Sequence, residues 1–156
     1  MDNTLNFEPD FESILPQTYA LITSGCLIVH PAVSRITLHG SRGLAGGCRP
    51  DSDLDLSLIV DAMQTPDING YLQDVILTTS SHWQGEVELD LAVIFDTRNC
   101  RLVCFEQRKW DDKICLSGGL DCFGLYKIHK GFTGLVRNAG IQVALMYPCV
   151  KIWQRR

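Results

Sequence analysis

Residues 38–56 read LHGSRGLAGGCRPDSDLDL, and this stretch decides the expected fold and the expected chemistry. It joins a short predicted strand, Ser34–His39, to a second one, Leu54–Val60. The residues between them, 40–51, include four glycines and one proline, which is typical of a loop. In the second strand, leucine or valine at 54, 56, 58 and 60 faces one side, and Asp53, Asp55, Ser57 and Ile59 face the other. The stretch therefore predicts a strand–loop–strand unit with an acidic face.

The segments on either side of this unit show the hydrophobic periodicity of two helices and a further strand. One predicted helix precedes the unit, over Pro16–Val29, and another follows it from Pro66 to about His82. Residues Glu86–Phe95 alternate apolar and polar side chains and predict a strand that carries Asp90. This order suggests an α+β or α/β domain.

The C-terminal part, residues 99–156, is less regular. Leu120–Ile128 favours a strand, Leu102–Trp110 fits either a helix or a strand, and Ile141–Trp153 is apolar but interrupted by Pro148. Six basic residues and no acid lie between Lys127 and Arg156. They indicate a solvated face or, slightly less strongly, a patch that faces phosphates or an acidic partner.

The composition limits the class of protein. The chain has 156 residues, of which 46% are hydrophobic and 21% charged, as expected for one globular domain. No run of eighteen apolar residues predicts a membrane span, and the acidic N-terminus resembles neither a signal nor a transit peptide. Seven scattered cysteines without a CxxC motif indicate reduced thiols, so we expect a cytoplasmic protein. The net charge of −4 argues against bulk binding of nucleic acid.

Three carboxylates fall where they can converge. Asp53 and Asp55 are two residues apart in a strand and so point the same way, and Asp90 joins them if its strand is a neighbour. Like charges about 5 Å apart repel by about 3 kcal/mol per pair, which favours a cluster that holds Mg²⁺ or Mn²⁺. We expect the three carboxyl groups within about 6 Å of one another, which one or two divalent ions can bridge. Glu88 shares a strand face with Asp90 and competes for the third position.

The turn after the first strand is suited to phosphate. Gly40 lets the backbone approach a ligand closely, and a helical turn starting at Ser41 would point free N–H groups at an anion. Arg42 and Arg49 flank the loop and can neutralise phosphate charge, and Ser52 can donate a further hydrogen bond.

Gly-Ser, a loop of eleven residues, Asp-x-Asp and a distal Asp in an apolar strand together resemble the nucleotidyltransferase superfamily of DNA polymerase β-like proteins. The likeness is greatest to its minimal single-domain members, and it covers about residues 10–98 of a single domain, 1–156. It implies an α+β fold with a mixed β-sheet flanked by helices. It implies that Gly40, Ser41, Arg42 and Ser52 hold a nucleoside triphosphate. It also implies that Asp53, Asp55 and Asp90 are the catalytic and metal-binding residues. The loop is about one residue longer than the commonest minimal pattern, and residues 99–156 match no motif of the family.

The resemblance predicts a transferase of the two-metal-ion type, which depends on Mg²⁺ or Mn²⁺ bound by Asp53, Asp55 and Asp90. It would move a nucleoside monophosphate from an NTP, with ATP expected, to a hydroxyl or phosphate on a small molecule or partner protein. A helical protein partner or a second copy of the chain is the expected associate. One alternative is a nucleotide- or partner-binding module that transfers nothing, such as a toxin–antitoxin component. The other alternative is an acidic sheet face with a purely structural role.

Overall fold

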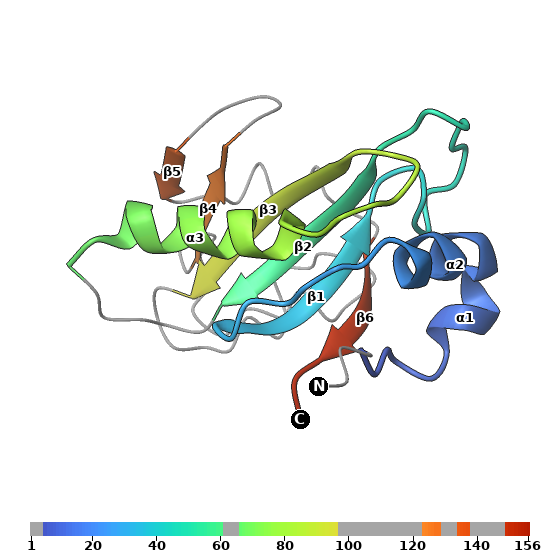
Figure 1. Ribbon diagram of the computed structural model, residues 1–156, viewed down its shortest axis with the longest axis horizontal. Helices are drawn as coiled ribbons and strands as arrows, with labels where there is room; N and C mark the ends of the chain where they lie inside the picture. Colours follow the sequence, from blue (N-terminus) through green and yellow to red (C-terminus); the bar gives the residue numbers. More distant parts are fainter. Residues whose placement is uncertain (1–4, 61–65, 97–122, 129–133, 138–148) are drawn as a thin grey trace, which may run out of the picture.

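A computed structural model describes residues 5–60, 66–96, 123–128, 134–137 and 149–156 of the chain. In chain order the elements are α1 (Phe11–Ile14), α2 (Pro16–Ser24), β1 (Val33–His39), β2 (Leu54–Val60), α3 (Ile68–Ser80), β3 (Leu89–Asp96), β4 (Phe123–Lys127), β5 (Gly134–Arg137) and β6 (Val150–Gln154). Figure 1 shows their arrangement in space. In this part of the chain no helix is long and apolar enough to cross a bilayer.

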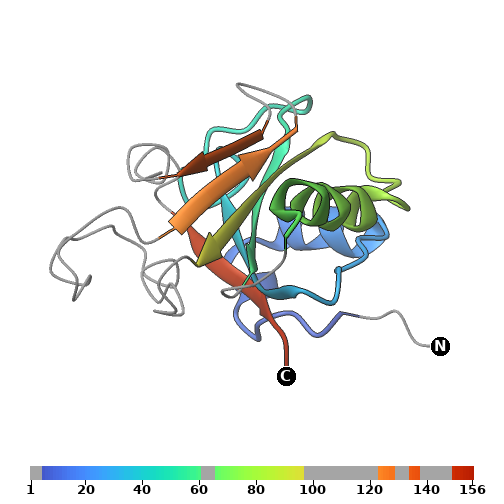
Figure 2. The ribbon, with the colours of Figure 1, turned by 90° about the vertical axis from the view of Figure 1, so that its left-hand side faces the viewer.

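The six strands form one mixed sheet in the order β5-β4-β3-β2-β1-β6. Among the described strands, only β2 and β3 run parallel, and every other neighbouring pair is antiparallel. A parallel pair needs a crossover connection, and α3 supplies it between β2 and β3. Figures 1 and 2 show α2 and α3 on the same side of this sheet. The expected α+β domain with a mixed sheet is therefore confirmed.

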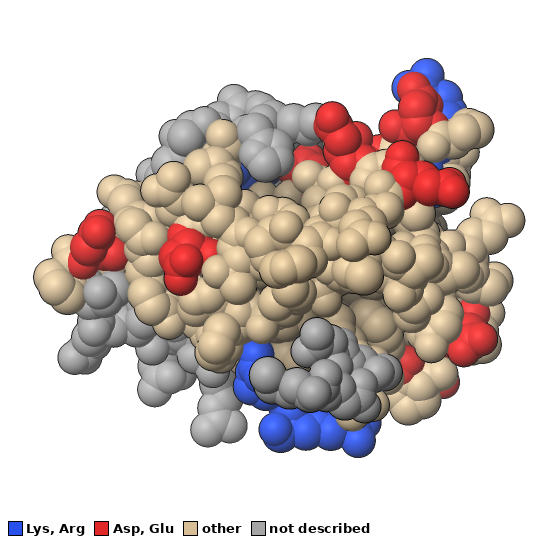
Figure 3. Space-filling model, viewed as in Figure 1, with Lys and Arg blue, Asp and Glu red and all other residues tan. Residues whose placement is uncertain are grey.

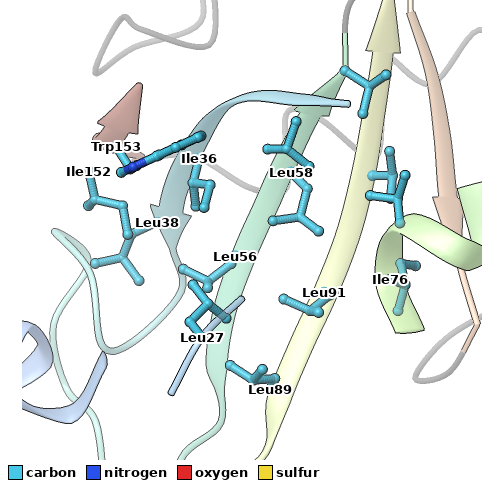
Figure 4. Close-up of a cluster of buried hydrophobic side chains, with 14 of the residues drawn as sticks. Leu27, Ile36, Leu38, Leu56, Leu58, Ile76, Leu89, Leu91, Ile152 and Trp153 are labelled. Carbon is cyan, nitrogen blue, oxygen red and sulfur yellow. The ribbon is translucent and has the colours of Figure 1, made fainter. Parts of the chain in front are cut away.

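The hydrophobic core lies between the sheet and these helices. The alternation of β2 places Leu54, Leu56, Leu58 and Val60 on this side, where all four are buried. Figure 4 shows how Leu56 and Leu58 lie beside Leu91 of β3 and Ile76 of α3. Burying each such side chain stabilises the fold by about 1.5–3 kcal/mol, so this pattern fixes which face of β2 points away from the helices.

Helix α2 begins at Pro16, as the sequence predicts, but it ends early. The prediction carried it to Val29, whereas it ends at Ser24, and Cys26 has a left-handed backbone with φ 59°. Here the chain turns at Gly25, where the ring of Trp83 leaves no room for a side chain. The carbonyl of Gly25 also accepts a 2.7 Å hydrogen bond from the Gln84 amide, so tertiary contacts override the helical pattern.

Helix α3 begins at Ile68, two residues after the predicted start, and its N-cap Asp67 accepts a 3.0 Å hydrogen bond from the Gly70 amide. The helix runs to Ser80, two residues short of the predicted end. The strand predicted over Glu86–Phe95 begins only at Leu89 and continues to Asp96.

The C-terminal part belongs to the same sheet. The strand predicted within Leu120–Ile128 is confirmed as β4, which pairs with β3. The end of the apolar segment 141–153 forms β6, which pairs with β1 at the opposite edge. Residues 102–110, for which helix and strand were both open, lie outside the described residues. The C-terminal residues thus extend the sheet on both sides of the predicted strands.

Candidate functional site

Four polar side chains form a row across four neighbouring strands, which we call the polar row: His39, Asp55, Asp90 and Lys127. His39 on β1 pairs in register with Asp55 on β2, which in turn pairs with Asp90 on β3. Lys127 ends β4 and reaches Asp90 through an ion pair. Cross-strand partners project to the same face of a sheet. Because the residues flanking Asp55 and Asp90 point into the core, the polar row lies on the face away from the helices.

The carboxyl groups of Asp55 and Asp90 lie close enough to share a hydrogen bond, which helps to raise the pKa of Asp55. Two carboxyl groups hydrogen-bond directly only while one of them carries a proton, so ionising both is disfavoured. Burial, followed by the hydrogen bond and the negative charge of Asp90, raises the pKa of Asp55 to about 6. The positive charge of Lys127 acts in the opposite direction. The pair therefore attracts a positive charge between its oxygens.

Lys127 supplies a fixed positive charge to this pair. Its Nζ lies 2.9 Å from Oδ1 of Asp90, and the two side chains are only 14% and 16% exposed. The sequence analysis placed Lys127 in a basic segment that faces solvent, phosphates or an acidic partner. In the structure its side chain is nearly buried and pairs with a predicted catalytic acid, so it does not face solvent.

Gly40 brings the end of β1 close to Asp55. Its φ is +77°, in the left-handed region that favours glycine. A Cβ at this position would collide with Oδ2 of Asp55, so the missing side chain makes room for the carboxylate. Gly40 was expected to let a ligand approach the backbone closely, and in this structure the group that lies there is the Asp55 carboxylate.

The loop after Gly40 forms a turn, with no helix at Ser41, which is half-buried. The Gly43 amide donates to the Gly40 carbonyl at 3.0 Å. The turn is held against α2 by Thr18, whose Oγ1 donates to the Arg42 carbonyl at 2.7 Å. The start of the predicted phosphate-binding loop is thus fixed to the helix side of the domain.

The side chains of Arg42 and Ser52 hold this loop through hydrogen bonds to its own backbone. Nε of Arg42 donates to the Ser52 carbonyl at 2.8 Å, and Nη2 lies 3.1 Å from the carbonyls of Arg49 and Pro50. Oγ of Ser52 accepts a 2.8 Å hydrogen bond from the Arg49 amide. Both residues were expected to contact phosphate, and the structure shows them engaged in holding the loop.

Asp53 lies one residue before β2 and is half-buried. Within the described ranges, no three acidic, histidine or cysteine side chains lie close enough together to hold a metal ion. The structure thus brings Asp55 and Asp90 together and does not gather Asp53 with them. Glu88, the competitor for the third position, precedes β3 and is exposed, so Asp90 is the distal acid that meets Asp55.

His39 and Lys127 are the two members of the polar row that the sequence interpretation missed. Burial lowers the pKa of His39 to about 4, with Asp90 raising it and Lys127 lowering it further, so the imidazole is neutral at neutral pH. Its Nε2 lies 3.0 Å from Oγ of Ser57. The alternation that places Ile36 and Leu38 in the core already assigns His39 to the acidic face. Lys127 gives no such signal, because its pairing depends on the register of β4.

The acid pair suits one small cation. A divalent ion can replace the shared proton, and carboxylate oxygens are the ligands that Mg²⁺ and Mn²⁺ prefer. Acidic side chains also gather over the end of the sheet where the loop between β1 and β2 lies (Figure 3). These negative charges would repel an anionic substrate. Such a substrate would need either a cation bound at the Asp55–Asp90 pair or the amides of the loop in order to approach this end of the sheet.

Comparisons with protein families and with curated proteins identify no relative of this chain. No protein-family model matches the chain, and no curated protein shows a significant match to it. The chemistry assigned to the polar row therefore rests on its geometry and on the order of its residues along the chain.

Proposed function

We propose that this protein is a metal-dependent nucleotidyltransferase. It would transfer a nucleoside monophosphate from an NTP, with ATP expected, to a hydroxyl or phosphate of a small molecule or a partner protein. In that reaction an acceptor oxygen forms a bond to the α-phosphorus while the bond to the bridging oxygen of pyrophosphate breaks. Pyrophosphate then leaves, and the acceptor proton passes to a nearby base.

One observation carries this proposal: Asp55 and Asp90 are register partners on adjacent parallel strands, with Gly40 packed against Asp55. The Gly-Ser turn, the first acid and the distal acid come from three segments that are separate in the sequence. Their meeting at one end of the sheet is the arrangement that the resemblance to nucleotidyltransferases implies. An acidic sheet surface without function would have no reason to bury two carboxyl groups together.

Asp55 and Asp90 are the residues that would hold Mg²⁺ or Mn²⁺. The ion, when bound, neutralises phosphate charge and polarises the phosphate that is transferred. The Gly40–Ser41 turn would hold the triphosphate with backbone amides and the Ser41 hydroxyl. A carboxylate of the pair would also accept the proton of an acceptor hydroxyl, because removing a shared proton leaves a base at the site.

A nucleotide- or partner-binding module without transfer is the second candidate. It is favoured by the ion pair between Lys127 and Asp90, which already neutralises one of the two acids. The described residues also provide two gathered carboxylates where the two-metal interpretation uses three. A binding module would retain nucleotide affinity and show no transfer.

Transfer from ATP labelled at the α-phosphate decides between the two candidates. The protein is incubated with Mg²⁺ and with extract from its own cells as the source of acceptors, and labelled products are separated by size. We expect a labelled product with the parent and none with Asp55→Asn or Asp90→Asn. A parent that binds ATP and gives no label beyond that of the Asn variants would support the binding module.

Ser41→Ala tests the triphosphate position. Loss of one hydrogen bond to a charged phosphate corresponds to about tenfold weaker binding of a non-hydrolysable ATP analogue, measured by calorimetry with Mg²⁺ present. Ser81→Ala, at the exposed C-terminal cap of α3, is the matched control and should bind like the parent. Equal affinities of the Ser41→Ala variant and the parent would remove Ser41 from the proposed site.

A further inference from the structure

The position of Lys127 bears on how many metal ions the proposed site takes. Its Nζ lies 2.9 Å from Oδ1 of Asp90, although Lys127 is on β4 and Asp90 is on β3. Both side chains are about 85% shielded from solvent, so water screens this ion pair little. An exposed lysine moves freely, whereas this one is held on the acid that the two-metal interpretation assigns to metal binding.

The charges of the polar row support a single divalent ion. Asp55 and Asp90 contribute two negative charges when both are ionised, and Lys127, which is ion-paired with Asp90, contributes one positive charge. The row therefore has one negative charge to offer, which one divalent ion more than balances. A second ion on Asp90 would lie within a few ångströms of the ammonium. At that separation the repulsion would weaken binding of the second ion by tenfold or more.

We propose that the ammonium of Lys127 is a built-in cation that takes the place of a second metal ion. The Asp55–Asp90 pair then binds one divalent ion, and the Lys127 ammonium, 2.9 Å from Oδ1 of Asp90, holds that carboxylate in position beside the ion. This inference rests on the proposed function, because it assigns the charges of the same site. It makes Lys127 a positioning residue, and the direct effect expected from its loss is a change in metal binding.

Binding of Mn²⁺ measured by electron paramagnetic resonance tests the proposal without any assay of transfer. Free Mn²⁺ is counted in titrations of the parent, Lys127→Met and Lys127→Arg. We expect one Mn²⁺ per parent chain and the same number with similar affinity in Lys127→Arg. Lys127→Met removes the positive charge but keeps most of the side-chain volume, and we expect it to bind Mn²⁺ at least about tenfold more tightly.

Lys151→Met is the matched control. Lys151 is on β6 and makes a 3.8 Å ion pair with Glu8, so its removal takes away one positive charge at the far edge of the sheet. Its Mn²⁺ affinity should stay within about twofold of the parent, because solvent screens charges beyond a Debye length of about 8–10 Å. If Lys127→Met does not fold, as judged by circular dichroism, Lys127→Gln replaces it with a polar side chain.

Each outcome has one meaning. Two Mn²⁺ ions on the parent, or unchanged or weaker binding by a folded Lys127→Met, overturns the role of Lys127 and leaves the proposed nucleotidyltransferase standing. Absence of Mn²⁺ binding by the parent and by every variant overturns the metal site itself, and the proposed function with it. One ion on the parent and tighter binding only in Lys127→Met supports the inference.

Discussion

Asp55 is held against the backbone of the neighbouring strand because Gly40 carries no side chain. Two separate constraints meet at Gly40: a positive φ of +77° and the carboxylate in front of its Cα. Either constraint alone favours glycine, but only the second depends on the candidate site. The glycine of the predicted phosphate turn therefore also fixes the position of the acid.

Gly40→Ala should destabilise the protein by more than a strained backbone alone. The left-handed φ costs about 1 kcal/mol for alanine, and the collision with Oδ2 of Asp55 adds to it, so we expect about 2–4 kcal/mol in urea unfolding. Gly46→Ala is the control, because φ is also positive there and a Cβ would meet nothing within 4 Å. Equal losses for both variants would show that Asp55 does not press on Gly40.

The raised pKa of Asp55 makes stability depend on pH. The folded state holds the proton up to pH about 6, whereas the ordinary value is 3.8, so the folded state binds more protons between these values. The free energy of unfolding therefore falls as pH rises through this window and stays lowered above it. Asp55→Asn should lack this dependence and be at least as stable as the parent at pH 7. Thermal melts from pH 3.5 to 7.5 measure the difference, and Mn²⁺ should stabilise only the parent.

A parent whose stability rises between pH 4 and 6 relative to Asp55→Asn would contradict the shared proton. The Asp55→Asn variant is the reference for the parent. The titration of the other carboxyl groups, which both proteins share, therefore cancels from the difference in stability. Asn keeps the shape of the side chain and can still donate to Asp90, which limits the change to the charge and the proton.

Alternation along single strands was enough to find Asp55 and Asp90, because each shares a strand with four buried apolar residues of the opposite face. It was not enough to find Lys127. Whether Lys127 meets Asp90 depends on how β4 is aligned with β3, and register is a property of two strands. The charge pattern predicted that Lys127 faces solvent, because a lysine side chain is seldom shielded from water unless it has a partner.

Among the elements, the loop between β1 and β2 is set by contacts that the sequence does not display. The glycines and Pro50 correctly predict a loop, but the three carbonyls bound by the Arg42 guanidinium determine its path. The early end of α2 has the same origin, because the ring of Trp83 and the Gln84 amide act on Gly25 from a distant segment. Local patterns give the type of an element, and tertiary contacts give its ends.

Arg42→Gln should loosen the loop and weaken nucleotide binding. Glutamine cannot span the carbonyls of Ser52, Arg49 and Pro50, so we expect a loss of about 1–2 kcal/mol of stability. Amide hydrogen exchange in residues 41–52 should become faster, while exchange in β2 should not change. Arg49→Gln is the control, since the Arg49–Asp51 ion pair is 78% exposed on both sides and worth little. Unchanged exchange in Arg42→Gln would mean that the loop is held by Thr18 and Ser52 alone.

At the scale of the whole molecule, the two ends of the described chain meet at β6, the strand that pairs with β1. The Phe7 backbone forms an isolated bridge with Trp153, and the Glu8 amide donates to the Ile152 carbonyl at 2.7 Å. Arg155 reaches across to the start of β1, where Nε lies 3.0 Å from the Val33 carbonyl and Nη2 3.0 Å from the His30 carbonyl. The strand that leads into the Gly40 turn is therefore held by the C-terminal segment.

Arg155→Ala should destabilise the whole domain even though the residue is exposed. It removes two hydrogen bonds to carbonyls and the stacking of the guanidinium on Trp153 at 5.1 Å, and we expect a loss of about 1–3 kcal/mol. Arg156→Ala removes a neighbouring exposed charge and should change stability by less than about 0.5 kcal/mol. Urea midpoints for both variants, at constant slope, provide the measurement. If Arg155→Ala and the parent had equal midpoints, backbone pairing alone would hold β6 against β1.

The pairing of β1 with β6 has a consequence for how the chain is made. Arg35 pairs with Gln154, so the outer edge of β1 has no partner until the ribosome has added more than a hundred further residues. At about 5–20 residues per second, this takes on the order of ten seconds. During that time the nascent chain presents a strand of mostly buried residues with open backbone groups to its surroundings. The newly made protein is therefore most prone to self-association during its own synthesis, and slower translation of its last third would lengthen that exposure.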